Sequence, residues 1–194
     1  MRINGFISLG VVLVSLFVPS GLYSKQVPGV VDSKNALPRA FTDGRLGHGI
    51  KVGERSLSDL EGNEVILSEF KGKTLFITFW APWNLDSVTT IQGLQVVSEY
   101  LSSRGIRERA VFLPVSDTNI DDVESIKLAR DSYGIGLSLY LDDDHELFDY
   151  FDVRAIPLTL IVDGDGVVIY RIAGYMKWDS DVVMKALLTV VGEE

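Results

Sequence analysis

The chain has 194 residues, of which 46% are hydrophobic, and its 18 Lys and Arg against 27 Asp and Glu give a formal net charge of −9 at pH 7. This balance is typical of a globular domain with some additional sequence, and the acidic charge argues against nucleic-acid binding, because phosphate backbones attract Lys and Arg. The sequence contains no cysteine, which excludes disulfides, thiolate metal ligands, thiol nucleophiles and lipid-modified cysteines.

Residues 1–24 predict a secretory signal peptide. Arg2 precedes an apolar run over residues 6–18, and small residues such as Ser20 and Ser24 follow it. The run is shorter than the ~20 apolar residues that cross a bilayer as a helix. We therefore expect a periplasmic or secreted protein. The alternative is a protein anchored in the membrane by an uncleaved segment at residues 6–18.

Residues 25–51 contain two prolines and four glycines and show no sustained hydrophobic period, which indicates a linker or a loosely packed arm. Residues 52–194 have the length of a single domain.

Strands and helices alternate along this expected domain. In chain order the patterns predict a hairpin at 56–70, a strand at 74–80, a helix at 86–101, a strand at 110–116, a helix at 119–133, a short strand at 137–141, a helix at 145–151, strands at 158–162 and 167–173, and a helix at 179–191. The central strand–helix–strand unit implies parallel strands with a right-handed crossover, and the late hairpin adds antiparallel strands. We expect an α/β protein with a mixed central sheet that has helices on both faces.

Three stretches carry a more specific pattern. Residues 60–83 join the hairpin, a Gly-Lys turn and a strand to the motif W-x-x-W, and residues 150–170 place a proline before D-x-x-G. Residues 139–151 add an acidic insertion. Together they resemble the thioredoxin-like family, in particular its exported TlpA/ResA-type branch, over about residues 50–194. The resemblance implies a thioredoxin-like fold with an N-terminal β-hairpin and a TlpA-type insertion.

The chemistry of that family uses two thiols spaced i and i+3 on the first turn of a helix. The matching positions are Asn84 and Ser87, and neither side chain can form a thiolate or exchange disulfides. Thr78 stands where the family often has a buried acid. Asn84 is instead a good N-cap residue, and Asp86 suits the first turn of a helix. We interpret the site as degenerate, and as a helix start suited to stability.

The second half of the family's site is the proline segment. The resemblance implies a cis peptide bond between Ile156 and Pro157, with backbone groups beside it that hold an extended substrate strand. Pro82, Trp83, Ile156 and Pro157 could form an apolar binding surface that needs no thiol. The alternative interpretation is that Trp80 and Trp83 are simply packed in the interior.

Two acidic stretches are weaker candidates for a site. Residues 142–146 carry the carboxylates that hard cations bind, but consecutive side chains diverge, and acids before a helix serve as caps. Residues 163–166 lack most ligands of a calcium loop and indicate a turn. His48 and His145 lie in no recognisable catalytic arrangement. We expect no metal and no cofactor.

These patterns lead to a primary functional hypothesis and an alternative. The primary hypothesis is an exported, non-catalytic thioredoxin-like protein that binds an envelope protein or an extended peptide segment around Trp83 and Pro157. The alternative, implied by family inheritance, is a thiol-disulfide oxidoreductase of TlpA/ResA type in redox homeostasis or cytochrome maturation. A third hypothesis is that the protein is a purely structural part of a larger complex. We expect no nucleic-acid partner, and membrane contact only if the N-terminal segment is retained.

Overall fold

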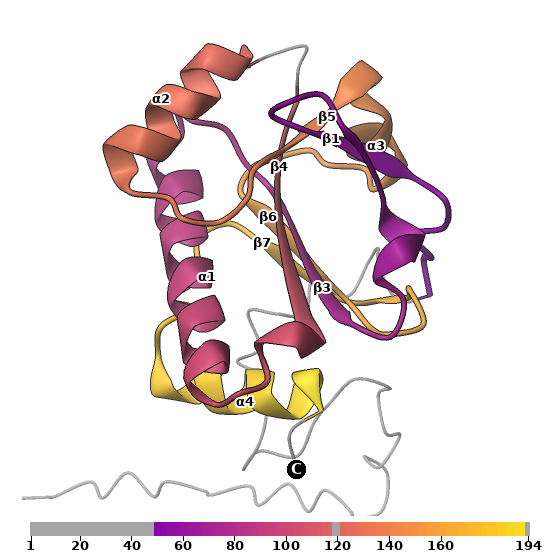
Figure 1. The fold of residues 1–194 in the computed structure, drawn as a ribbon, viewed down its shortest axis with the longest axis vertical. Coiled ribbons are helices and arrows are strands. Elements are labelled where there is room, and N and C mark those ends of the chain that lie inside the picture. The colour runs from indigo at the N-terminus through magenta and orange to yellow at the C-terminus, as the bar shows by residue number, and fades with distance from the viewer. Residues whose placement is uncertain (1–48, 118–120, 193–194) are drawn as a thin grey trace, which may run out of the picture. The chain divides into compact units, whose positions relative to one another are not determined.

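The computed structural model describes residues 49–117 and 121–192 of the chain (Figure 1). The expected signal peptide at 1–24 and nearly all of the expected arm at 25–51 lie outside the described residues. Within the described ranges, no helix combines the length and the apolar character needed to cross a membrane.

A seven-stranded mixed sheet in the order β2-β1-β5-β4-β3-β6-β7 forms the centre of the fold. The central strand β3 (Thr74–Phe79) is buried at every position, as its continuous apolar run predicts. It pairs in parallel with β4 (Ala110–Asp117) and antiparallel with β6 (Leu158–Val162). The late hairpin then adds β7 (Val168–Ala173) antiparallel to β6. The mixed sheet expected from the sequence is confirmed.

The N-terminal hairpin and the insertion complete the other edge of the sheet. The hairpin consists of β1 (Ser56–Asp59) and β2 (Glu64–Ile66). The insertion supplies β5 (Tyr140–Asp142), which pairs in parallel with β4 and antiparallel with β1. The insertion therefore joins the hairpin to the rest of the sheet.

Helices cover both faces of the sheet, as expected. Buried side chains of α1 (Leu85–Ser103), α2 (Val123–Tyr133) and α4 (Asp181–Val191) form one apolar cluster against the first face. In Figure 1, α1 and α2 lie along the same side of the sheet. The opposite face packs against the 3-10 helix η2 (Leu67–Phe70) and α3 (Glu146–Tyr150).

The proline in β4 explains why β5 is shorter than its sequence pattern predicts. The Val115 carbonyl accepts a hydrogen bond from the Trp80 amide at 3.0 Å, so Val115 bonds toward β3. Because bonding direction alternates along a strand, Pro114 faces the β5 side, where it has no N–H to donate. Pairing with β5 starts only at Val115, opposite Tyr140, and residues 137–139 stay outside the strand.

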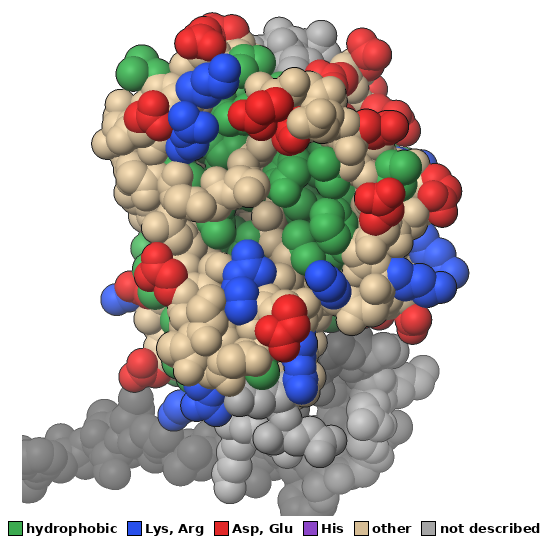
Figure 2. All heavy atoms as spheres, in the orientation of Figure 1, with side chains coloured by type: hydrophobic (Ala, Val, Ile, Leu, Met, Phe, Trp, Pro, Cys, Tyr) green, Lys and Arg blue, Asp and Glu red, His purple; other side chains and the backbone are tan. Residues whose placement is uncertain are grey.

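The early part of β4 is therefore not covered by β5. From the viewpoint of Figure 1, hydrophobic side chains gather near the centre of the visible face, over β4, with charged side chains around them (Figure 2). The Arg107 guanidinium lies 5.1 Å from the ring centre of Phe112, and its Nη1 donates to the Ala110 carbonyl at 2.6 Å. This side chain protects part of the open edge from pairing with another strand.

The ends of two helices differ from the expected ones for local reasons. The helix expected from residue 119 begins at Val123, because Asp122 is its N-cap and accepts a hydrogen bond from the Ser125 amide at 2.8 Å. The last helix, expected from residue 179, begins at Asp181 after the N-cap residue Ser180.

The acidic insertion uses Asp142 as a buried cap for α3. Its two carboxylate oxygens accept hydrogen bonds from the Leu147 and Phe148 amides at 3.0 and 2.9 Å, and only 1% of the residue is exposed. Burial raises the pKa of Asp142, while these two hydrogen bonds oppose the rise. Phe148 in turn packs edge-on against Phe79, with ring centres 4.8 Å apart. Asp142 thus positions the helix that covers the second face of the sheet.

We predict that Asp142→Ala lowers the free energy of unfolding by about 2 kcal/mol, because it leaves two buried amides without an acceptor. Asp149→Ala is the matched control, since Asp149 is an exposed acid on the same short helix and should change stability by less than ~0.5 kcal/mol. Urea unfolding measures both variants. Equal effects of the two substitutions would contradict the role of Asp142 as a cap.

Candidate functional site

The Asn84 side chain connects the two segments that the family resemblance brings together. Its Oδ1 accepts a hydrogen bond from the Ser87 amide at 2.9 Å and so caps α1, as predicted. Its Nδ2 donates to the Ile156 carbonyl at 3.4 Å, across 72 residues of sequence. One amide therefore stabilises the helix start and also holds it beside the proline segment.

The peptide bond between Ile156 and Pro157 is cis. Pro157 is buried and its carbonyl accepts from the Gly174 amide at 2.8 Å, whereas Ile156 is partly exposed. Among the described residues, none accepts a hydrogen bond from the Ile156 N–H. Of the four residues expected to form the apolar surface, Pro82, Trp83 and Ile156 are accessible, whereas Pro157 is buried.

The two tryptophans of the W-x-x-W motif differ completely in exposure. Trp80 is fully buried in the interior, whereas 65% of Trp83 is exposed, so packing accounts only for the first. The Trp83 indole N–H donates to Asp121 Oδ1 at 3.0 Å, which fixes the exposed ring. Leu85, at the start of α1, is also 68% exposed. An exposed apolar patch of this kind is a common feature of binding surfaces.

Asp121 is a member of this site that the sequence pattern did not reveal. It lies 38 residues from Trp83 and is only 5% exposed. Burial raises the pKa of Asp121, the Trp83 hydrogen bond opposes this rise, and the carboxylates of Asp117 and Asp122 add to it. In the sequence, Asp121 falls within the helix expected at 119–133. No local signal points to its contact with Trp83.

Ser87 and Thr78 occupy the positions where the family resemblance expects a thiol and a buried acid. Ser87 is fully buried, and among the described residues its hydroxyl has no hydrogen-bond partner. A thiol, which bonds weakly, would tolerate this place better than a hydroxyl. The buried Thr78 hydroxyl is paired with that of Thr159 at 3.1 Å. Neither residue supplies a thiolate or a titrating acid.

The other residues that the sequence offered as candidates for a catalytic or metal site form structural contacts where the structure describes them. Within the described residues, no group of three His, Cys, Asp or Glu side chains could hold a metal ion. His145 Nδ1 lies 2.6 Å from Asp117 Oδ2, and Asp163 accepts from the Asp165 and Val167 amides in the expected turn. His48 lies outside the described residues.

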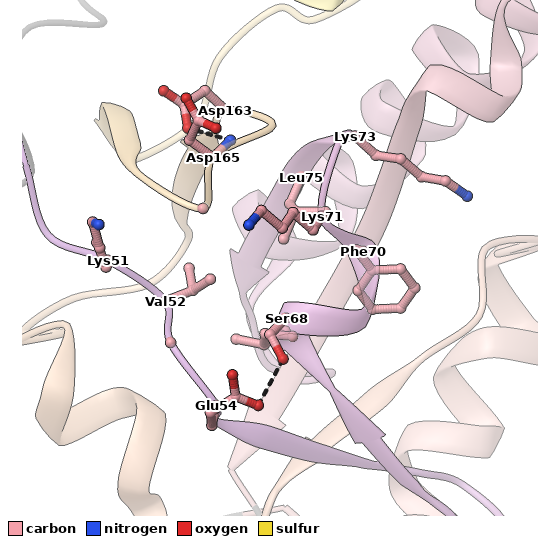
Figure 3. A pocket seen from close by; sticks show the side chains of 13 residues that line it. Lys51, Val52, Glu54, Ser68, Phe70, Lys71, Lys73, Leu75, Asp163 and Asp165 are labelled. Atoms are coloured by element: carbon pink, nitrogen blue, oxygen red, sulfur yellow. Dashed lines mark hydrogen bonds between the residues drawn. The ribbon is translucent and has the colours of Figure 1, made fainter.

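A separate cavity of about 190 Å³ lies beside residues 51–54, at the other end of β3 from Asn84 (Figure 3). Among its polar groups, the Ser68 hydroxyl donates to Glu54 at 2.8 Å. In Figure 3, Lys71 points toward the open space whereas Lys73 points away. The cavity shows no converging set of groups and is not part of the site.

Comparison with known proteins identifies the family. Residues 49–171 match the AhpC/TSA family, and the chain belongs to this family of thioredoxin-like proteins. The chain is similar to the thiol-disulfide oxidoreductase ResA of Bacillus subtilis (strain 168), with 28% identity over 120 residues that cover 62% of this chain and 64% of that relative. ResA of Geobacillus thermodenitrificans (strain NG80-2) is 26% identical over 120 residues, and the match covers 66% of its length. The match thus covers slightly less than two thirds of the length of each of these relatives.

Solved structures support the thioredoxin-like fold. A putative thiol:disulfide interchange protein DsbE from Chlorobium tepidum superposes with a TM-score of 0.64 at 17% identity, covering 76% of this chain and 99% of the other. DsbF from MTB gives a TM-score of 0.59 at 20% identity, covering 70% and 95%. At these identities the likeness shows the fold alone, and the thioredoxin-like fold expected from the sequence is confirmed.

Truncation of Asn84 and truncation of Ser87, the two positions that match the family's thiols, should change the free energy of unfolding in opposite directions. Asn84→Ala should lower the free energy of unfolding by about 1 kcal/mol through loss of the cap. Ser87→Ala should raise it by about 1 kcal/mol, because it removes a buried hydroxyl that has no partner. Denaturant unfolding of both variants measures these changes.

Thr89→Ala is the control for helix propensity, since Thr89 is exposed on the same helix and bonds only to the Leu85 carbonyl. A gain from Ser87→Ala no larger than that from Thr89→Ala would mean that the buried hydroxyl carries no cost.

Proposed function

We propose that the protein is a non-catalytic member of the thioredoxin-like family that acts in the cell envelope by binding an extended segment of another protein. The docking surface consists of Pro82, Trp83, Leu85 and Ile156. One observation carries the proposal: the binding half of the site is intact and hydrogen-bonded, although both reacting atoms are absent. The predicted signal at residues 1–24 supports an exported location.

The backbone at Ile156 supports binding of an extended segment. Its N–H has no acceptor among the described residues, and its carbonyl receives one hydrogen bond, 3.4 Å long, from Asn84. An extended chain that lies beside this residue can form the main-chain hydrogen bonds of strand addition. This interaction does not depend on sulfur.

Trp83 supplies the apolar anchor of the surface. Tryptophan is enriched among the residues that carry most of the energy of protein interfaces, and its truncation there typically costs more than ~2 kcal/mol. The hydrogen bond to Asp121 holds the indole in one position before a partner arrives. A fixed ring loses less conformational entropy on binding than a free one.

The names of the relatives favour the alternative, a thiol-disulfide oxidoreductase. Disulfide exchange requires attack by a thiolate sulfur on a disulfide. The 194 residues contain no sulfur except in three methionines, whose thioethers cannot carry out this step. Asn84 and Ser87 occupy the positions of the missing thiols. The composition therefore favours binding over catalysis.

A reductase assay separates the two functions. The purified protein should show no reduction of insulin disulfides above the rate of dithiothreitol alone. The double variant Asn84→Cys with Ser87→Cys is the matched control, because thiols at i and i+3 of a first helical turn can form a disulfide. Reduction by the unmodified chain would contradict the non-catalytic proposal. A control variant that forms no disulfide under mild oxidant would mean that the helix start departs from the family geometry.

Photo-crosslinking in envelope extracts tests the docking surface. Benzoylphenylalanine placed at Leu85 should trap a defined protein adduct, whereas the same group at Val182 should not. Val182 is 60% exposed, similar to Leu85, but lies on the distant helix α4. Combining the Leu85 probe with Trp83→Ala should reduce the adduct about tenfold. Equal adducts from both positions, or an adduct unaffected by Trp83→Ala, would place the interface elsewhere.

A further inference from the structure

A groove runs between Trp83 and the neighbouring helix α2. It has a volume of about 380 Å³ and is lined by both apolar and acidic side chains. The residues that matter for its chemistry are Trp83, Asp121, Asp122, Leu128 and Tyr133. We call it the Trp83 groove.

We propose that the Trp83 groove receives an arginine side chain of the segment that docks at Ile156. This inference rests on the proposed function and specifies the chemistry of its partner. It assigns a positive charge to the residue of the bound segment that contacts Trp83.

The lining of the groove has the composition of a cation site. It contains the aromatic rings of Trp83 and Tyr133 and the carboxylates of Asp121 and Asp122, and none of the described residues that line it is Lys, Arg or His. The face of an indole attracts cations through its quadrupole, and Arg is found there more often than Lys. Two carboxylates without a basic neighbour in the lining leave the groove negative.

Asp121 supplies an unfilled acceptor within the groove. Only 5% of the residue is exposed, and its Oδ1 already accepts a hydrogen bond from the Trp83 indole N–H. Among the described residues no other donor reaches its side chain, so Oδ2 is free to accept a hydrogen bond. The Asp122 oxygens already accept from the Ser125 amide and hydroxyl at 2.8 and 2.9 Å. Asp122 therefore adds charge, and it offsets the positive end of α2.

The shape of an arginine matches these groups. Its planar guanidinium can stack on the fixed Trp83 ring while one N–H donates to Asp121 Oδ2. Its aliphatic stem can lie along Leu128, which is 68% exposed on α2. A lysine ammonium would satisfy the charge but not the stacking. The net charge of −9 further favours a basic partner, because opposite charges increase the rate of encounter.

The test uses N-acetyl-arginine amide as the probe and N-acetyl-citrulline amide as its uncharged isostere. Trp83 is the only strongly exposed of the three tryptophans, so its indole N–H signal in two-dimensional NMR reports on the groove. Trp83→Phe assigns that signal by its disappearance. We expect the arginine amide to shift it in a saturable manner, and the citrulline amide to bind about tenfold more weakly.

Two pairs of variants locate the binding. Asp121→Asn should weaken arginine binding about tenfold, whereas Asp131→Asn, which alters an exposed acid of α2 outside the groove, should not. Leu128→Lys places a tethered cation at an exposed rim position and should block the probe, whereas Leu128→Gln should not. The Leu128 pair keeps the test decisive if Asp121→Asn fails to fold.

The results separate this inference from the proposed function. Equal binding of arginine and citrulline amides, equal effects of Asp121→Asn and Asp131→Asn, or no shift of the Trp83 signal at any soluble concentration would overturn the arginine assignment. If the Leu85 crosslink persisted in such a case, only the groove inference would fall. Specific arginine binding without a Leu85 adduct would support the groove and would overturn docking at Ile156.

Discussion

The site depends on one side chain, the amide of Asn84. A carboxamide carries both an acceptor and a donor, so it can cap α1 through the Ser87 amide and also reach the Ile156 carbonyl. A cysteine at this position could make neither interaction with comparable strength, because sulfur is a weak hydrogen-bond former. At the position that matches the family's first thiol, the amide thus links the two halves of the site.

Ser87, at the position that matches the family's second thiol, forms no comparable side-chain hydrogen bond with a described residue. Ser87 retains a polar hydroxyl in a fully buried place where no described residue bonds to it. The nearby Thr78 is different, because its hydroxyl forms a pair with Thr159 across β3 and β6. Selection for stability alone would favour alanine over serine at position 87. The site therefore combines a side chain with two hydrogen bonds, Asn84, and a buried hydroxyl with none among the described residues, Ser87.

The sequence predicted those parts of the structure that are set by local patterns. The apolar run of β3, the turn at Asp163 and the cap at Asn84 each follow from neighbouring residues, and the structure contains all three. The late start of β5 pairing depends on which way Pro114 faces in the sheet, which a single-strand pattern does not specify. The contact between Trp83 and Asp121 was equally inaccessible, since it joins two loops 38 residues apart. The fold was thus predictable, whereas the acidic wall of the Trp83 groove was not.

The arrangement at Trp83 is unfavourable for an isolated monomer. A large indole stays mostly in solvent, and it is fixed by a carboxylate whose pKa is raised by burial. Burying an ionised carboxylate is costly, and leaving the indole exposed forgoes the apolar burial that stabilises a fold. Both features become favourable once a partner covers the ring and supplies a cation to the carboxylate. A preorganised aromatic face beside a buried acid therefore fits the proposed recognition of a basic ligand.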